Sequence, residues 1–355
     1  MKITKLLNIA LVVVLGIGSL QAQDIHFSQF FASPLNLNPA TTGVLSCDLR
    51  FSTIYRNQWA SVLNSKAFNT FSAGIETRLP VGKSDYWGLG LNLWADKAGS
   101  SSFSSVHGSI NGSFIKRLGG RRSLDMFLVA GGALGFSQRS IKTLNLQFGN
   151  QWTGDSFDGS STTGEDMLSG WNTRLTYADM AAGLFWWMAL DHDAKSTVNA
   201  GIAFNHLTKA KLNFIANANE FEALFLKTTL HFGGDFRVRR RLAIVPNVIM
   251  LFQGPSVETN FGTAIKFDFS KRSVSNQAFE IGPWLRIVSS PTGSIATDAV
   301  VAVARIRYGS STFGVSYDIN TSRLRQASRG NGAFEVSYVY TLCGVRNRPI
   351  GCPTF

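Results

Sequence analysis

The sequence has little charge, little proline and few cysteines, and after its first twenty residues it lacks any apolar run long enough for a membrane-spanning helix. Its 355 residues include 9 prolines, 3 cysteines and 16% charged side chains, against 34 glycines and 12% aromatics. A helix needs about 20 apolar residues to cross a bilayer. Beyond its first segment the chain can therefore cross a membrane only with strands, which its aromatic and glycine content favours.

Signatures of catalysis, metal binding and nucleotide binding are also missing. The chain has no GxSxG motif and no Walker-type phosphate loop. Its five histidines are scattered without the spacing of metal ligands: His26, His107, His192, His206 and His231. The triplet at residues 191–193, Asp-His-Asp, falls in an expected short turn, where solvation explains it. We expect no enzyme activity, no cofactor and no metal site.

The first 22 residues have the form of a secretory signal peptide. Two lysines precede an apolar run from Leu6 to about Leu20, and small and polar residues follow. We expect cleavage after Ala22. An uncleaved anchor helix is the alternative, but the run is short for a span. The net charge of +12 would suggest nucleic-acid binding in a cytoplasmic protein. Because we expect this protein to be exported, we expect no nucleic-acid partner.

Strict alternation of apolar and polar residues dominates residues 49–342. Between Ser311 and Asn320, for example, every second residue from Phe313 to Ile319 is apolar or aromatic. One face of the strand is therefore apolar and the other is polar. We predict fourteen strands at 49–56, 68–78, 86–95, 103–116, 124–136, 176–189, 197–207, 223–237, 241–252, 257–268, 278–288, 297–308, 311–320 and 332–342. Membrane strands need about 9–11 residues, whereas strands of soluble sandwiches cluster near 5–6. The pattern predicts an all-β, transmembrane outer-membrane β-barrel of antiparallel strands, with charges facing the lumen.

The connections between these strands alternate between long and short. The odd-numbered connections include the three longest, residues 137–175, 208–222 and 57–67. Outer-membrane barrels have short periplasmic turns and long outer loops. We therefore expect both ends of the barrel in the periplasm and the long loops outside.

Two segments flank the predicted barrel. The lead-in, residues 23–48, has no strand period but is rich in apolar residues that need partners, and we expect it to plug or cover the periplasmic mouth. The tail, residues 343–355, is expected in the periplasm. The short turns carry many basic residues, above all Arg237, Arg239, Arg240 and Arg241. These form either a solvated rim or a contact for an acidic partner.

The three cysteines lie at the two ends of the mature chain. Cys47 directly precedes the first predicted strand and Cys343 directly follows the last. Closing the barrel pairs these strands, which brings the two positions to the same rim. We predict a disulfide that involves Cys47, with Cys343 or Cys352 as its partner.

The lead-in and the first strand also carry a family signature. QDIHFSQFFASPLNLNPATTG (residues 23–43) followed by RFSTIYRNQW (50–59) resembles the PorP/SprF family of Bacteroidota, and the ending, SRGNGAFEVSYVY with a Cys-Pro-x-Phe terminus, is similar to that family too. The resemblance implies an outer-membrane barrel of type IX secretion that helps cargo, including gliding adhesins with a type-B C-terminal domain, to reach or stay on the cell surface. It implies no catalytic residues. It makes these motif positions structural or partner-facing: Pro34, Asn38, Pro39, Arg56, Asn57 and Trp59.

Three functions compete at this point. The first is a secretion-associated barrel that binds cargo protein and other type IX secretion components. The second is a diffusion porin or small-molecule transporter, against which a lead-in plug and the expected lumenal side chains of Arg286, Arg305 and Arg307 argue. The third is a barrel enzyme, which would need a catalytic set at one rim.

Overall fold

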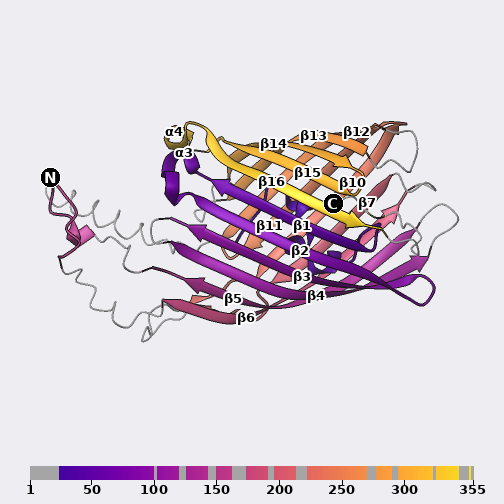
Figure 1. Cartoon of the computed structure of the whole chain (residues 1–355), viewed down its shortest axis with the longest axis horizontal. Helices are drawn as coiled ribbons and strands as arrows, with labels where there is room; N and C mark the ends of the chain where they lie inside the picture. Colours follow the sequence, from indigo (N-terminus) through magenta and orange to yellow (C-terminus); the bar gives the residue numbers. More distant parts are fainter. Residues whose placement is uncertain are drawn as a thin grey trace, which may run out of the picture.

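Fourteen antiparallel strands close into one barrel in the computed structural model (Figure 1). The structure describes residues 24–99, 102–119, 125–142, 149–161, 173–190, 196–212, 222–269, 277–289, 295–322, 325–343 and 352. The expected signal peptide, residues 1–22, and most of the expected tail lie outside these residues. Among the described helices, none has the length and apolar character needed to cross a membrane.

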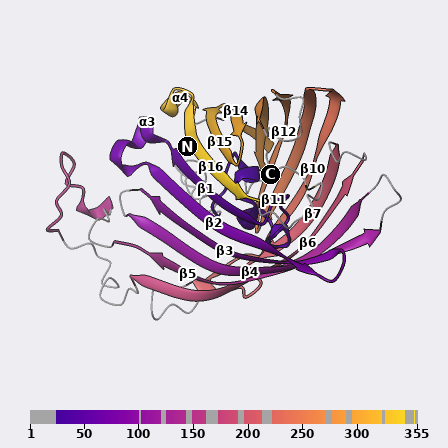
Figure 2. The ribbon, with the colours of Figure 1, turned by 45° about the vertical axis from the view of Figure 1, so that its right-hand side comes forward.

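Each barrel strand pairs with its neighbours in sequence, and the last strand pairs with the first to close the barrel (Figure 2). The strands are β1 (Leu49–Gln58), β2 (Phe68–Val81), β3 (Asp85–Ala98), β4 (Phe103–Gly119), β5 (Met126–Ser140), β6 (Arg174–Ala189), β7 (Thr197–Asn205), β10 (Lys227–Arg239), β11 (Leu242–Gln253), β12 (Ser256–Asp268), β13 (Gln277–Ser289), β14 (Ile295–Tyr308), β15 (Ser311–Asn320) and β16 (Asn331–Leu342).

The predicted fourteen-stranded barrel is thus confirmed, and each predicted strand overlaps an observed one. Two strands differ most: the one expected over 124–136 extends to Ser140, and the one expected over 223–237 begins at Lys227. Residue 223, where the latter strand was expected to begin, lies instead in β9 (Glu222–Ala223), which pairs with β8 (Lys211–Leu212) in a separate small sheet.

The two faces of the strands divide as the alternation predicts. In β15 the side chains of Phe313, Val315, Tyr317 and Ile319 are exposed on the outside, while Gly314, Ser316, Asp318 and Asn320 are buried inside the barrel. The outer face is thus an apolar belt, as a bilayer requires, and the polar side chains line the lumen.

The barrel has two unlike rims. The turn rim holds Cys47, Cys343 and the strand ends that flank the short connections 82–84, 120–125, 190–196, 240–241, 269–276 and 309–310. The loop rim holds the strand ends that flank the connections 59–67, 99–102, 141–173, 206–226, 254–255, 290–294 and 321–330, together with the described residues of these connections. We expect the turn rim in the periplasm and the loop rim outside the cell.

The lead-in does not merely cover one mouth. Residues 24–46, here called the plug, run through the lumen from the loop rim to the turn rim, so the expected placement at the periplasmic mouth is too shallow. The plug contains η1 (Phe30–Ala32), α2 (Pro34–Leu37) and η2 (Pro39–Thr41). Prolines begin the last two because proline suits the first position of a helix, and the Asn38 side chain caps η2 by accepting from Ala40 N.

Candidate functional site

The plug begins near the loop rim, where Asp24 is held by several strands. Its backbone N–H donates to Gln253 Oε1 at the end of β11 (3.0 Å). Its carboxylate makes a short contact with His206 Nε2, and His206 Nδ1 lies 2.7 Å from Asp179 Oδ2 on β6. Arg139 and Lys227 approach the same carboxylate at 3.7 and 3.9 Å. Three charged groups of the wall and one backbone hydrogen bond to Gln253 therefore hold the first residue of the plug.

The ionisation of Asp24 and His206 favours this arrangement. Burial alone would lower the pKa of His206, but the charge of Asp24 and the hydrogen bonds to both carboxylates raise it from 6.5 to about 9. Burial opposes the charged form of Asp24, but His206, Lys227 and Arg139 outweigh it and hold its pKa well below the usual 3.8. An imidazolium between two carboxylates is therefore the stable state near neutral pH.

A buried ion network holds Ser28 and Gln29 further along the plug. Glu335 on β16 accepts the backbone N–H groups of Ser28 (2.7 Å) and Gln29 (2.9 Å) through its two carboxylate oxygens. Arg56 on β1 pairs with the same carboxylate at 2.5 Å and also donates to Ser28 Oγ at 2.9 Å. All four residues are nearly inaccessible to solvent. Buried charges of this kind persist only when they are paired and hydrogen-bonded.

Two further lumenal charges complete this network. Asp318 on β15 accepts from Ser28 Oγ (2.7 Å) and from Arg56 Nη2 (3.1 Å). Arg286 on β13 donates to Asp318 at 2.9 Å. The plug hydroxyl of Ser28 thus lies among groups from β1, β13 and β15, and it ties three separated strands together.

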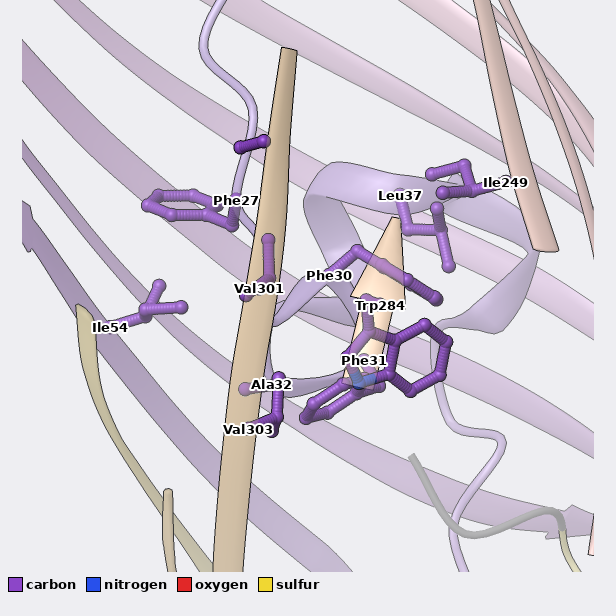
Figure 3. Close-up of a cluster of buried hydrophobic side chains, with 11 residues drawn as sticks. Phe27, Phe30, Phe31, Ala32, Leu37, Ile54, Ile249, Trp284, Val301 and Val303 are labelled. Carbon is purple, nitrogen blue, oxygen red and sulfur yellow. The ribbon is translucent and has the colours of Figure 1, made fainter. Parts of the chain in front are cut away.

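An apolar cluster packs the middle of the plug against the wall (Figure 3). The ring centroids of Phe30 and Trp284 lie 5.7 Å apart in an edge-to-face arrangement, and the guanidinium of Arg305 lies 4.0 Å from the Phe31 ring centroid. The cluster is completed by Phe27, Ala32, Leu37, Ile54, Ile249, Ala299, Val301 and Val303. These contacts explain why the apolar lead-in residues lie deep in the lumen instead of at its mouth.

Glycines of the wall make room for the second half of the plug. The Asn38 side chain donates to Leu184 O at 3.0 Å, and a Cβ placed on Gly183 would lie 2.0 Å from Asn38 Oδ1. A Cβ on Gly131 would lie 2.5 Å from Ala40 Cα, and one on Gly88 would lie 2.2 Å from Thr42 O. The plug and the barrel interior are therefore shaped to each other.

The end of the plug is fastened at the turn rim. Glu76 on β2 accepts from Gly43 N (2.8 Å) and from Arg50 Nε (2.9 Å). Arg78 donates to Leu45 O at 2.6 Å. Cys47 is disulfide-bonded to Cys343, with a Cα–Cα distance of 4.4 Å. The remaining thiol, Cys352, accepts from Arg78 Nη1 at 3.9 Å.

The motif positions fall into two groups. Pro34, Asn38 and Pro39 lie in the plug and are buried with Arg56 inside the barrel. Asn57 and Trp59 lie at the loop rim. Asn57 donates to Asn69 Oδ1 (2.7 Å), and the Trp59 ring packs on Phe68 with centroids 5.2 Å apart.

The basic turn between β10 and β11 lies at the turn rim. Arg237 is half-buried and pairs with Asp268 at 2.5 Å. Arg239, Arg240 and Arg241 are exposed, and within the described residues none of the three makes an ion pair. Elsewhere on this rim, Lys116 and Arg117 are paired with Asp85 and Asp125. The free positive charge of the described part of the turn rim is thus concentrated at this turn.

Little space remains between plug and wall near the loop rim. A cavity of about 60 Å³ with both polar and apolar lining lies beside Asp24, Asn36, His107 and Asn205. That is room for a few water molecules at ~10–15 Å³ each. Among the residues that the structure describes, no group of three His, Cys, Asp or Glu side chains is placed to hold a metal ion.

Residues 19–340 match the family model described as type IX secretion system membrane protein PorP/SprF. The chain belongs to the PorP/SprF family. This PorP/SprF protein is accordingly an outer-membrane β-barrel of type IX secretion, as the resemblance of its lead-in predicts. No curated protein matches the chain.

Several solved barrels are similar to this PorP/SprF protein. The CymD monoaromatic hydrocarbon channel is 11% identical with a TM-score of 0.49, covering 94% of this chain and 97% of its own. The toluene transporter TbuX of Ralstonia pickettii is 11% identical with a TM-score of 0.47, covering 87% and 92%. The toluene transporter TodX of Pseudomonas putida is 10% identical with a TM-score of 0.45, covering 90% and 95%.

Proposed function

We propose that this barrel serves type IX secretion as a closed docking protein. It binds exported cargo, of the gliding-adhesin class with a type-B C-terminal domain, and helps to export it or to anchor it at the cell surface. The observation that carries the proposal is the plug: the lumen is occupied by the protein's own residues 24–46, so the surfaces left for function are the rims.

The way in which the plug is held favours a permanent closure. Its contacts include the buried ion pair of Arg56 with Glu335, the apolar cluster around Trp284 and the glycine positions that fit Asn38 and Ala40. Opening the lumen would expose all of these and leave charges without partners, which is costly. This argues against a diffusion porin or small-molecule transporter. The charged side chains of these contacts are already paired with each other or with the plug, which supports a non-enzymatic role.

Backbone strain points to the loop rim as the working surface. Within the described residues, six non-glycine positions have positive φ, and all six lie in loop-rim connections: Trp59, Asn64, Ser102, His206, Lys209 and Arg329. Such conformations cost roughly 1–3 kcal/mol each and tend to cluster at functional sites. Since we expect this rim outside the cell, it is the rim that can meet surface-displayed cargo.

The turn rim offers a second contact. The exposed Arg239, Arg240 and Arg241 suit an acidic partner. We assign this contact to a periplasmic component of the secretion machine, because the turn rim is expected in that compartment.

Deletion of the gene tests the proposal. Proteins exposed at the surface of intact cells are identified by brief protease treatment and mass spectrometry in the wild type, the deletion strain and the complemented strain. We expect a small set of exported proteins to disappear from the surface and to return on complementation, with uptake of small solutes unchanged. An unchanged surface set, or a loss of solute uptake alone, would contradict the proposal.

A further inference from the structure

The loop rim carries a raised feature above the strands that close the barrel. Helix α3 (Ala60–Leu63) and the following turn η3 (Asn64–Lys66) come from the connection after β1, and α4 (Arg325–Ser328) comes from the connection before β16. The two helices lie side by side at one end of the barrel (Figures 1 and 2). We call the described parts of residues 59–67 and 321–330 the ridge.

The ridge is basic and contains no acid. Residues 59–67 and 321–330 contain no Asp or Glu. The side chains of Lys66, Arg325 and Arg329 are exposed, and none of them forms an ion pair with a described residue. This contrasts with the lumen, where Arg56 and Arg286 are both paired. Unpaired positive charge on a surface without counter-charges favours an acidic partner.

Apolar and aromatic groups accompany these charges. Val62 is 43% exposed, and Trp59 is half-buried at the start of α3. Tryptophan and arginine are the residues most enriched among those that contribute strongly to protein interfaces. A surface of this composition suits a protein partner better than a lipid phosphate alone, because a phosphate group makes no favourable contact with the apolar side chains.

The ridge is also strained and is tied to the barrel by backbone hydrogen bonds. Trp59, Asn64 and Arg329 have φ of 61°, 49° and 51°. Trp59 N donates to Gly332 O at 2.9 Å, which ties the ridge to β16, and Leu63 N donates back to Trp59 O at 2.9 Å. A preorganised surface loses less conformational entropy on binding than a mobile loop.

The ridge stands on the two strands that hold the plug. Arg56 lies three positions before Trp59 in the chain, and its partner Glu335 lies just after the second connection. The plug network therefore supports the surface from below. This gives the buried ion pairs a role in presenting the ridge as well as in closing the lumen.

We propose that the ridge is the docking surface for cargo, and that it receives an acidic segment of the exported protein that also carries apolar side chains. This rests on the proposed function and narrows it: of all the loop-rim connections, those before β16 and after β1 make the contact.

Charge reversal tests the assignment. The double variant Arg325→Glu/Arg329→Glu alters exposed side chains outside the barrel, so assembly should be retained, as judged by heat-dependent electrophoretic mobility. The matched control is Lys142→Glu/Lys209→Glu, which makes the same charge change at exposed positions elsewhere on the loop rim. The readout is the set of surface proteins that the deletion strain loses.

We expect the ridge variant to lower surface display of that set about tenfold, equivalent to roughly 1.4 kcal/mol of binding free energy, while the control displays it normally. If both double variants reduce display equally, general charge matters and the ridge assignment is wrong. If the ridge variant displays cargo normally but loses co-purifying lipopolysaccharide, the ridge binds lipid phosphate and the proposal is again wrong. In both cases the proposed function stands, because its own test is the set of surface proteins that the deletion strain loses.

Discussion

Replacing Glu335 with alanine should detach the start of the plug without opening the barrel wall. The carboxylate is fully buried, pairs with Arg56 and accepts from Ser28 N and Gln29 N. Removing one partner of a buried ion pair costs about 3–5 kcal/mol, and each orphaned N–H costs about 1–3 kcal/mol. Because these costs overlap and the plug can partly relax, we expect about 4 kcal/mol for local detachment.

Amide hydrogen exchange in detergent micelles measures this directly. A loss of about 4 kcal/mol accelerates exchange about a thousandfold where local opening controls it. We expect that acceleration in the peptide containing Ser28 and Gln29, with β-strand peptides unchanged. The matched control is Asp85→Ala, which removes a carboxylate from an ion pair at the rim whose lysine is exposed and should leave the plug unaffected.

The reasoning fails if the plug of an assembled Glu335→Ala barrel exchanges as slowly as that of the wild type. Should the alanine variant not assemble, Glu335→Gln keeps the shape and one acceptor. It should then show a smaller acceleration at the same two residues and none elsewhere.

Three further predictions concern the packing of the plug against wall glycines, the disulfide, and the ion pair of Asp24 with His206. Gly183→Ala places a Cβ 2.0 Å from Asn38 Oδ1 and should lower the free energy of unfolding by about 2–4 kcal/mol. The barrel should then lose its heat-dependent electrophoretic mobility at a lower temperature. The control is Gly112→Ala, whose Cβ has nothing within 4 Å and which should behave as wild type. Cys47→Ser opens a link across 296 residues and should cost about 6 kcal/mol in the chain-entropy model; a denaturation midpoint equal to that of the non-reduced wild type would rule this out. The pKa of His206 is raised from 6.5 to about 9, so its contribution to stability is complete below pH 6.5 and is lost as pH rises through about 9. The pKa of Asp24 is lowered, so its contribution is complete above the usual value of 3.8 and is lost as pH falls below it. The protection of residues 24–27 from exchange, relative to the unfolded chain at the same pH, should therefore fall at both extremes, and constant protection from pH 5 to 10 would contradict the pairing.

The barrel itself could be predicted from the sequence because alternation is a local signal. In β3, for example, Trp87, Leu89, Leu91 and Leu93 alternate with small or polar residues, and the structure exposes the first set and turns the second inward. The strand count and the division of faces follow from this pattern alone.

The plug network could not be predicted because it depends on register. Arg56 and Glu335 are 279 positions apart and meet only once β1 pairs with β16 in one alignment. The sequence pattern places both residues on the polar faces of their strands, but it does not show that they meet at Ser28. The depth of the lead-in was missed for the same reason: its phenylalanines pack on Trp284, whose lumenal position shows only after closure. His206 gave no signal, since its partner Asp24 lies 182 positions away.

Conductance of the purified wild-type barrel in a planar lipid bilayer tests the central claim most directly. If residues 24–46 close the lumen permanently, the inserted protein should show no stable open-channel current, and a variant lacking residues 24–44 but retaining the disulfide should conduct. Steady open-channel steps from the wild type, with the plug intact by mass, would show that the lumen is a path and not a support for docking surfaces.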